Sequence, residues 1–307
     1  MSGPLNSGSQ LLKFCRFFLG VLGVLGGSAF SVCAQPVAVV DDRGKPVGLA
    51  APAQRIVALA PSLVELAFAA GAGERLVGAA RFSDFPPGAR DIPQVGDAAR
   101  VDFERIVALK PDLVLAWKSG NSAADVGRLE SLGYPAFVSE PARLADVPRL
   151  LRAIGALAGT LPAAASAAAE FEREIIALRG RYAMARKVRV FYQIWHRPLL
   201  TVNGAHMISD VIALCGGENV FSDMTPLTPS VTLEAVIAAK PEMILGGGSA
   251  GGEKEFAAQW RASSVPSLRE LPAHYVNPDH IQRQTPRIVE GVKAVCSALE
   301  NVRRNRR

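Results

Sequence analysis

Histidine, a common catalytic and metal-ligating residue, is scarce in this chain of 307 residues. Its few histidines are scattered, which argues against a metal site built from them. They are His196, His206, His274 and His280. The chain has no His-Glu-x-x-His motif, and the glycine-rich stretch 246–252 lacks the Lys-Ser/Thr pair of a phosphate-binding loop. These absences disfavour a metalloprotease and a nucleotide-binding enzyme, and we interpret 246–252 as a surface connection.

The chain also lacks an apolar run of the length that a typical membrane span requires. Phe17–Phe30 is about 14 residues long, whereas a spanning helix needs roughly 20. Lys13 and Arg16 precede this run, and the small residue Ala34 ends it. This pattern predicts a signal peptide at 1–34, cleaved after Ala34, and a mature protein exported to the periplasm. An uncleaved membrane anchor is the lesser alternative, and a lipoprotein attached through Cys33 is weaker still.

Cysteine is rare, with four in the whole sequence. Cys15 and Cys33 would leave with the signal peptide. Cys215 and Cys296 would then remain as a pair in an oxidising compartment, where disulfides form and persist. We therefore predict a Cys215–Cys296 disulfide; two free buried thiols are the alternative.

The formal net charge of +6 does not indicate a nucleic-acid partner. No basic stripe interleaved with aromatic residues occurs inside the expected folded region. Much of the basic excess lies in the last residues, namely Arg303, Arg304, Arg306 and Arg307. We expect this arginine tail to be a frayed, solvated end.

What the sequence does contain is an internal echo. Residues 102–115 read DFERIVALKPDLVL, and residues 232–245 read TLEAVIAAKPEMIL. Each stretch predicts a capped helix with a glutamate in its first turn, a Lys-Pro stop and a buried strand. A helix–strand unit used twice indicates two similar α/β lobes, and a cleft between paired lobes is a natural ligand site.

Strands and helices alternate along both halves, which predicts an α/β fold with two doubly wound, Rossmann-like lobes. Between them, the alanine-rich stretch Thr160–Tyr182 predicts one long helix that joins the lobes and limits them to small movements. The domains expected are a signal peptide (1–34), an N-terminal lobe (35–159), an interdomain helix (160–186) and a C-terminal lobe (187–307). Within the first lobe, Ser62 and Glu65 have the spacing of a capping box at the start of a helix. Thr285 and Pro286 are expected to begin a final helix ending near Leu299.

Ligands of open parallel sheets bind at the carboxyl ends of the strands, so the residues that leave each strand are the binding candidates. They are Ser62, Phe82, Trp117, Trp195, Asp279 and Arg283. Aromatic side chains with a few polar groups suit a large, flat, partly apolar ligand. Phe82 and Trp117 could instead be ordinary core residues, and Asp279 and Arg283 a simple surface ion pair.

Several motifs resemble those of the periplasmic cobalamin-binding proteins that serve ABC importers. They are RIVAL (55–59), ELAFAAG (65–71), SDFPP (83–87), ERIVALKPDLVLAW (104–117), CGGEN (215–219) and Pro286-Arg287. The resemblance runs from about Arg55 to Leu299. It implies two lobes joined by a single helix, the architecture also shared by siderophore and haem binders.

The resemblance implies a role for individual positions. Phe82 stands where the family has a tyrosine facing the corrin ring, and Trp117 where it has a tryptophan. Asp279 and Arg283 stand where an Asp and an Arg hydrogen-bond the amide-bearing periphery of the ligand. Glu104 and Glu234, one per lobe, match the surface glutamates that dock on the membrane permease dimer. The protein implied is no enzyme: it is a monomer when free, has no cofactor, and carries a corrinoid as its transported ligand.

Three positions depart from the family pattern. Ala98, Leu200 and Thr228 stand where the cobalamin binders carry two tryptophans and a phenylalanine, so much of the aromatic cage is missing. A haem or Fe(III)-siderophore ligand therefore stays open, with His196 or His280 as a candidate axial ligand for haem. From another class, an exported enzyme that uses the same cleft is the remaining alternative.

Overall fold

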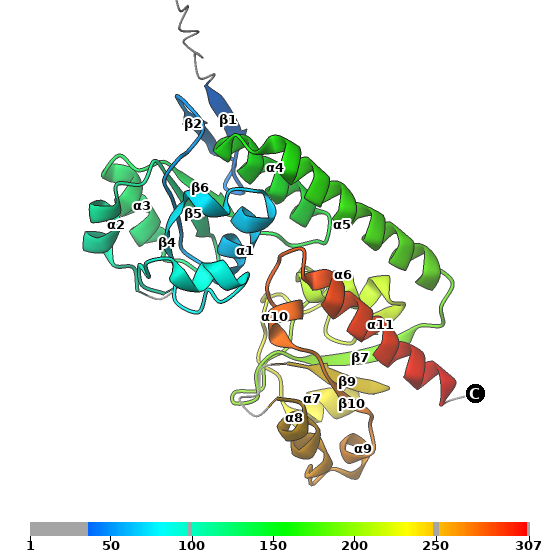
Figure 1. Cartoon of the computed structure of the whole chain (residues 1–307). Helices are drawn as coiled ribbons and strands as arrows, with labels where there is room; N and C mark the ends of the chain where they lie inside the picture. The colour runs from blue at the N-terminus through cyan, green and yellow to red at the C-terminus, as the bar shows by residue number, and fades with distance from the viewer. Residues whose placement is uncertain (1–35, 98–99, 248–251, 306–307) are drawn as a thin grey trace, which may run out of the picture. The chain divides into compact units, whose positions relative to one another are not determined.

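Two four-stranded parallel sheets, one on each side of a long helix in chain order, organise the computed structural model of the protein (Figure 1). The structure describes residues 36–97, 100–247 and 252–305. The predicted signal peptide, Ala98, most of the glycine-rich stretch and the last two arginines lie outside these residues. The α/β fold with two lobes joined by one helix is confirmed.

The first sheet has the strand order β4-β3-β5-β6 and all its neighbours are parallel. Its strands are β3 (Ile56–Ala58), β4 (Leu76–Ala79), β5 (Leu113–Trp117) and β6 (Ala136–Ser139). The helices of this lobe are α1 (Pro61–Ala69), α2 (Phe103–Leu109), α3 (Ala123–Ser131) and α4 (Asp146–Ala158), with short 3-10 turns η1 (Gly73–Arg75) and η2 (Pro87–Asp91). An antiparallel hairpin of β1 (Val37–Val40) and β2 (Pro46–Leu49) precedes them.

The second sheet has the order β10-β9-β7-β8, again with parallel neighbours. Its strands are β7 (Val188–Gln193), β8 (Gly217–Asn219), β9 (Met243–Gly246) and β10 (Ala273–Tyr275). Its helices are α6 (Met207–Leu214), α7 (Leu233–Ala238), α8 (Gly252–Arg261), α9 (Pro266–Arg269), α10 (Pro278–Ile281) and α11 (Ile288–Arg304). If the strands of each lobe are numbered in chain order, both sheets have the order 2-1-3-4, so the lobes share one topology.

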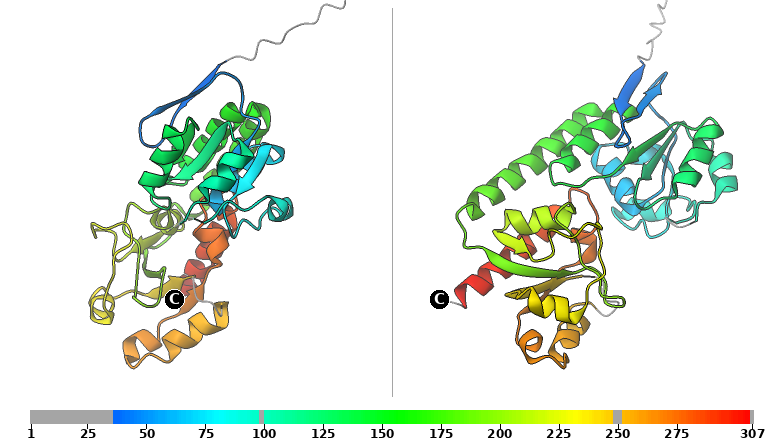
Figure 2. Two further views of the ribbon diagram at one scale, coloured as in Figure 1. Left: turned by 90° about the vertical axis from the view of Figure 1, so that its left-hand side faces the viewer. Right: turned by 180° about the vertical axis from the view of Figure 1, so that it is seen from behind.

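Helices cover both faces of each sheet (Figure 2). Successive strand residues point to opposite faces. In β5, Leu113 and Leu115 pack with α1 and α4, whereas Val114 packs with Ile106 of α2 and Leu129 of α3. Burial on both faces explains why these strands are continuous apolar runs rather than alternating ones.

The echoed segments form equivalent elements, α2 with β5 in one lobe and α7 with β9 in the other. The cap predictions are confirmed. Asp102 accepts a hydrogen bond from the Arg105 N–H (3.0 Å), and Thr232 accepts one from the Ala235 N–H (3.2 Å). After each helix, Lys110 and Lys240 adopt a left-handed backbone conformation that ends the helix ahead of the proline.

The first strand of each lobe is anchored to its echo segment in the same way. In the N-terminal lobe, the Asp112 carboxylate accepts the backbone N–H of Arg55, and the Arg55 guanidinium donates to the carbonyl of Leu109. In the C-terminal lobe, Glu242 accepts the N–H of Arg189, whose guanidinium donates to the carbonyls of Ala239 and Lys240. The echo therefore specifies tertiary contacts as well as local structure.

The connecting helix α5 spans Leu161–Tyr182, 22 residues, close to the range that the sequence predicts. Its buried side chains, Ala164, Ala168, Phe171, Ile175 and Tyr182, belong to one core cluster with residues of both sheets. Arg152 of α4 pairs with Glu172 of α5 through two hydrogen bonds of 2.7 and 2.8 Å. The helix is thus packed against folded structure rather than acting as a free linker, whereas the domain boundaries drawn from the sequence stay a prediction.

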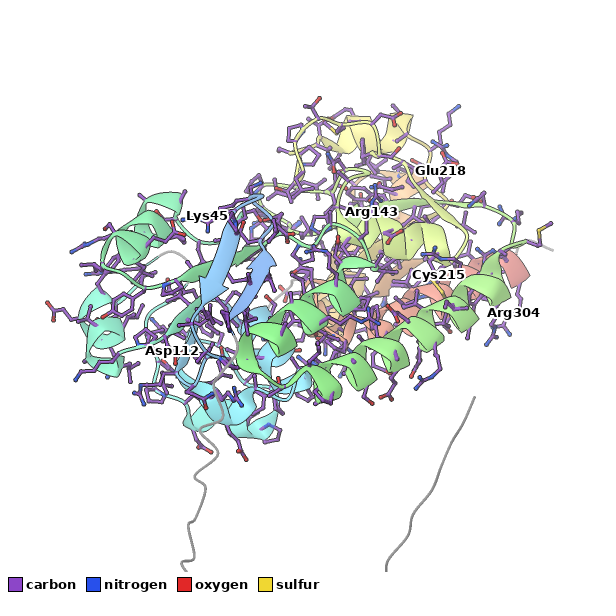
Figure 3. All side chains as sticks on the ribbon, turned by 90° about the horizontal axis from the view of Figure 1, so that it is seen from above. Lys45, Asp112, Arg143, Cys215, Glu218 and Arg304 are labelled. Carbon is purple, nitrogen blue, oxygen red and sulfur yellow. A yellow bond between two sulfur atoms is a disulfide. The ribbon has the colours of Figure 1, made fainter. Side chains whose placement is uncertain are left out.

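The predicted disulfide between Cys215 and Cys296 is confirmed; Cys215 lies at the end of α6 and Cys296 within α11 (Figure 3). The prediction of a frayed arginine tail is wrong for Arg303 and Arg304, because α11 continues to Arg304. Arg303 donates to the carbonyl of Cys215 (2.6 Å) and to that of Arg186 (2.8 Å). The first contact satisfies a carbonyl at the end of α6, and the second holds the segment that follows α5.

Candidate functional site

The loop after β4 carries the first candidate, Phe82, whose side chain is 70% exposed. Its backbone is left-handed (φ 67°), a conformation that is uncommon for a non-glycine residue and often marks a functional loop. The hydroxyl of Ser83 donates to the carbonyl of Ala80 (2.7 Å) and braces the turn. A pocket of about 340 Å³ in this lobe is lined by Phe82, Asp84 and neighbouring residues. The alternative that Phe82 is an ordinary core residue is excluded by its exposure.

Trp117 ends β5 and is half-buried against the core of its lobe. A side chain at position 120 would collide with its ring, since a Cβ there would lie within 2 Å of it; Gly120 therefore makes room for the indole. The buried side chain of Asn121 accepts the Trp117 N–H (2.7 Å) and donates to the carbonyl of Leu59 (3.0 Å). Asn121 thus ties the carboxyl ends of β5 and β3 together.

Trp195 follows β7 and is 53% exposed. Its indole N–H donates to the carbonyl of Arg197 (3.0 Å), and its backbone pairs with Leu200 in an isolated antiparallel bridge. Ser62 is partly exposed near the start of α1. Ser62 follows the carboxyl end of β3 and Trp195 that of β7, the sheet edge at which the sequence predicts ligand binding.

Arg283 lies at the centre of a charged cluster that joins the two lobes. Its Nη1 lies 2.9 Å from Glu65 Oε1 and 2.7 Å from Asp84 Oδ1, both in the N-terminal lobe. Its Nη2 lies 2.9 Å from Asp279 Oδ1 and 3.5 Å from the carbonyl oxygen of Phe82. Asp279 and Arg283 do form an ion pair, but the arginine also bonds the loop that carries Phe82.

Glu65 is the buried member of this cluster, 3% exposed and surrounded by apolar residues of α1. The capping-box prediction for Ser62 and Glu65 is wrong: α1 begins at Pro61 with Ala60 as its N-cap and no side-chain cap. The prediction of a helix cap at Thr285 is also wrong, because α11 begins at Ile288 and the Thr285 hydroxyl donates to Glu65 (2.8 Å). The side chains of Glu65 and Thr285 instead bond each other across the contact between the lobes.

The charges of the cluster favour its ionised state. Burial raises the pKa of Asp84, but the hydrogen bond and positive charge of Arg283 outweigh this and hold that pKa below its ordinary value. Burial lowers the pKa of Arg283, but its bonds to Asp84 and Glu65 more than compensate, so the pKa is raised. The guanidinium is therefore always charged when a ligand arrives.

The structure brings Phe82, Asp279 and Arg283 together. Ser62, Trp117 and Trp195 make no hydrogen bond or ion pair with this group among residues 36–97, 100–247 and 252–305. Sequence reasoning missed Glu65, Asp84, Asn121 and Arg287 as parts of the site. For Glu65 a signal existed, because a carboxylate inside the apolar run from Leu63 to Ala70 needs a buried partner.

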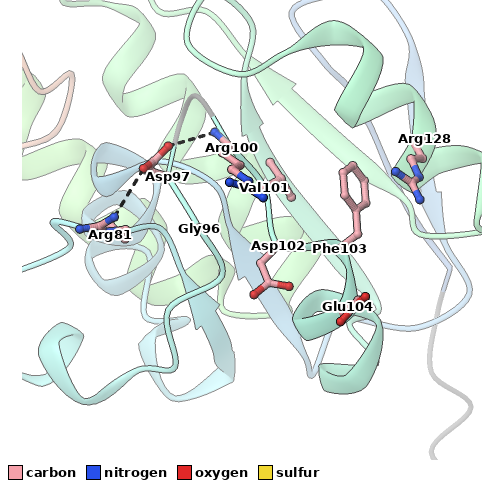
Figure 4. Close-up of a pocket in the computed structure, with 9 residues that line it drawn as sticks. All are labelled: Arg81, Gly96, Asp97, Arg100, Val101, Asp102, Phe103, Glu104 and Arg128. Carbon is pink, nitrogen blue, oxygen red and sulfur yellow. Dashed lines mark hydrogen bonds and ion pairs between the residues drawn. The ribbon is translucent and has the colours of Figure 1, made fainter.

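Glu104 and Glu234 lie exposed in the first turns of α2 and α7. Backbone and Thr232 hydrogen bonds lower the pKa of Glu234, so it is anionic. A pocket of about 560 Å³ opens beside Glu104, with Arg81, Asp97 and Arg128 in its lining (Figure 4).

Within the described part of the chain, no group of three or more His, Cys, Asp or Glu side chains is placed to hold a metal ion. No helix in that part is both long and apolar enough to cross a bilayer.

Known proteins resemble this chain in sequence and in its arrangement of two lobes joined by one helix. The sequence model described as "Periplasmic binding protein" matches residues 56–274. This chain belongs to the periplasmic binding protein family. The vitamin B12-binding protein of Vibrio parahaemolyticus is 35% identical over 255 residues, which are 83% of this chain and 92% of that protein. The vitamin B12-binding protein of Yersinia pestis is 34% identical over 250 residues, 81% of this chain and 88% of that protein.

Solved structures agree with this assignment to the periplasmic binding protein family. The periplasmic vitamin B12-binding protein BtuF of Vibrio cholerae superposes with a TM-score of 0.75 at 32% identity, covering 82% of this chain and 98% of that one. The periplasmic heme-binding protein RhuT of Roseiflexus sp. RS-1 gives a TM-score of 0.71 at 23% identity, covering 81% and 98%. The second likeness shows a shared fold. Members of this family are solute-binding proteins.

Proposed function

We propose that this periplasmic binding protein captures cobalamin or a related corrinoid between its lobes and delivers it to a membrane ABC permease. The observation that carries the proposal is the meeting of exposed Phe82 with the Asp279–Arg283 pair at the contact between lobes. Relatives above 30% identity that are named vitamin B12-binding proteins support the ligand class. The proposal includes export through residues 1–34, a protein that is monomeric when free, and binding without catalysis or a cofactor.

The chemistry of a corrinoid suits these side chains. Its macrocycle is a broad apolar face, which aromatic rings such as Phe82, Trp117 and Trp195 can cover. Its amide-bearing edge needs hydrogen-bond partners, which Arg283 and Asp279 can supply. Four N–H donors of Arg283 already have acceptors, so a ligand carbonyl would take over a bond now accepted by Asp84, Asp279 or the Phe82 carbonyl.

Isothermal titration of the mature protein with cyanocobalamin is expected to show saturable one-to-one binding. Trp117→Ala is expected to weaken it by about 1 kcal/mol or more, because the ligand loses an aromatic face. Tyr134→Ala is the matched control: Tyr134 is also half-buried but lies at the amino end of β6, the opposite sheet edge. Absence of binding at high micromolar ligand would refute the proposed ligand, and an unchanged affinity of Trp117→Ala would place Trp117 outside the site.

Haem is the second candidate, and His196 favours it. His196 follows Trp195 directly, and its buried Nδ1 has no partner among the described residues. Burial lowers the pKa of His196, so its imidazole is neutral at pH 7 and able to ligate iron. An absorbance titration with hemin separates the two candidates. Axial ligation of haem iron by a histidine shifts the Soret band of hemin, whereas a protein that binds only cobalamin leaves that band unchanged.

Replacing Glu104 and Glu234 together with alanine is expected to abolish transport by the cognate permease while leaving ligand affinity unchanged. Both carboxylates are exposed, one per lobe, where a two-fold symmetric partner could bind them at once. Uptake of labelled cobalamin by reconstituted permease measures the effect. Glu74→Ala with Glu270→Ala is the control, since these exposed glutamates also lie one in each lobe. Normal uptake by the first double variant would reduce Glu104 and Glu234 to favourable helix-dipole charges.

A further inference from the structure

Glu65 makes four hydrogen bonds, and all of them cross from the N-terminal lobe to one short segment of the C-terminal lobe. Its Oε1 accepts from Arg283 Nη1 (2.9 Å) and Arg287 Nη2 (2.7 Å). Its Oε2 accepts from Arg287 Nε (3.0 Å) and Thr285 Oγ1 (2.8 Å). A carboxylate has about four acceptor positions, so Glu65 is fully used. No position is left for a ligand, and the side chain is too buried to reach one.

The partners of Glu65 continue directly into the ligand site. The second donor on Arg283 Nη1 bonds Asp84, and its Nη2 reaches the Phe82 carbonyl and Asp279. Arg287 binds Glu65 with a two-pronged fork, and its guanidinium also stacks on the ring of Phe85, 3.9 Å from the centroid. The loop that carries Phe82 is therefore attached to the other lobe at three points.

Another buried acid shows what distinguishes Glu65. Asp41 is 4% exposed and is paired with Arg43, but its partners all belong to the N-terminal lobe. Asp41 therefore supports one lobe internally, whereas Glu65 links the two. Charge assistance and the bidentate fork give the Glu65 link a fixed direction that an apolar contact would lack.

We propose that Glu65 is a positioning residue for ligand binding: it sets the separation of the lobes and the direction of Arg283 without contacting the ligand. The inference deepens the proposed function. Of its two tests, the measurement of ligand affinity rests on that function, whereas the measurement of the distance between the lobes does not depend on the ligand. A site whose two walls come from different lobes binds tightly only when their spacing is fixed before the ligand arrives, because ordering the walls during binding costs free energy.

The test compares Glu65→Gln with Asp41→Asn in two measurements. In the first, spin labels on Ser131→Cys in α3 and Ser267→Cys in α9, both exposed positions, report the distance distribution between lobes. Glu65→Gln is expected to broaden it, because an amide cannot accept from all four donors and brings its own N–H groups against the arginines. Asp41→Asn is expected to leave it as in the parent. Equal distributions in the parent and Glu65→Gln would overturn the proposal, whatever the ligand.

In the second measurement, cyanocobalamin affinity is taken well below the unfolding temperature of every variant. Glu65→Gln is expected to bind at least tenfold more weakly than the parent, and Asp41→Asn within twofold of it. An equal loss in both variants, or none in Glu65→Gln, would overturn the proposal, because affinity would then follow general stability or ignore Glu65. A parent that binds hemin but no cobalamin refutes the proposed ligand instead, and hemin then replaces cobalamin in this measurement. If Glu65→Gln fails to fold, Arg287→Lys replaces it. This variant keeps the positive charge but loses the two-pronged bond to Glu65, and its ligand affinity is expected to fall threefold. The same outcomes would overturn the proposal.

Discussion

Replacing Cys215 and Cys296 together with alanine is expected to lower the free energy of unfolding by about 4 kcal/mol. The two cysteines are 81 residues apart, so the disulfide removes many conformations from the unfolded chain. It joins the end of α6 to α11, and both side chains are buried. Urea denaturation of the double variant and of the oxidised parent measures the difference.

The single variants are the control for side-chain loss, because each removes one buried sulfur as well as the crosslink. Cys215→Ala and Cys296→Ala are each expected to lose nearly as much stability as the double variant, since either one opens the loop. A loss below 1 kcal/mol in the double variant would contradict the prediction, because it would mean that the disulfide removes few conformations from the unfolded chain.

Acidification from pH 6.5 to pH 4 is expected to remove about 2 kcal/mol of stability through His206 alone. His206 is the N-cap of α6, where its Nδ1 accepts the Ile208 N–H (3.1 Å). Burial lowers the pKa of His206 from 6.5 to about 4. Between these values the unfolded chain binds the proton more readily than the folded one, so stability falls as the pH falls. Below about pH 4 this contribution is lost completely.

Protonation acts on the cap in two ways. It removes the acceptor at Nδ1, and it places a positive charge at the positive end of the helix dipole. His206→Asn keeps an acceptor that does not titrate, and asparagine is a favoured N-cap. Urea denaturation at pH 7.5 and pH 4.5 is expected to show a smaller pH-dependent loss in His206→Asn than in the parent. Parallel losses would assign the acid sensitivity to other groups, such as His274, whose pKa burial also lowers.

The repeat of residues 102–115 and 232–245 predicted the local structure of both segments and the presence of two similar lobes. It indicated a helix, a stop and a buried strand in each lobe, and these are α2 with β5 and α7 with β9. The prediction succeeds because it rests on local rules: caps, a proline that ends a helix, and apolar runs for strands buried on both faces. The strand order common to the lobes lay beyond it, since pairing depends on contacts between distant segments.

The candidate site was predicted less completely, and Glu65 shows the reason. Its spacing from Ser62 fits a capping box with Ser62 as N-cap, yet the helix begins two residues earlier, at Pro61, and Glu65 lies on its buried face. Its true partners, Arg283 and Arg287, are more than 200 residues away along the chain. The Arg303 contacts were missed for the same reason, because a charged tail is expected to be solvated unless distant carbonyls accept from it.

The sequence by itself determined the α/β class of the lobes, the helix that joins them, the disulfide and the residues at the strand ends, because these follow from periodicity, composition and cysteine count. The tertiary structure alone decided which of those residues meet. Buried charges must be paired, and the fold meets that requirement by bringing Glu65 of one lobe against Arg283 and Arg287 of the other. Pairing across such a sequence distance is fixed by the packing of whole lobes, to which no local pattern is sensitive.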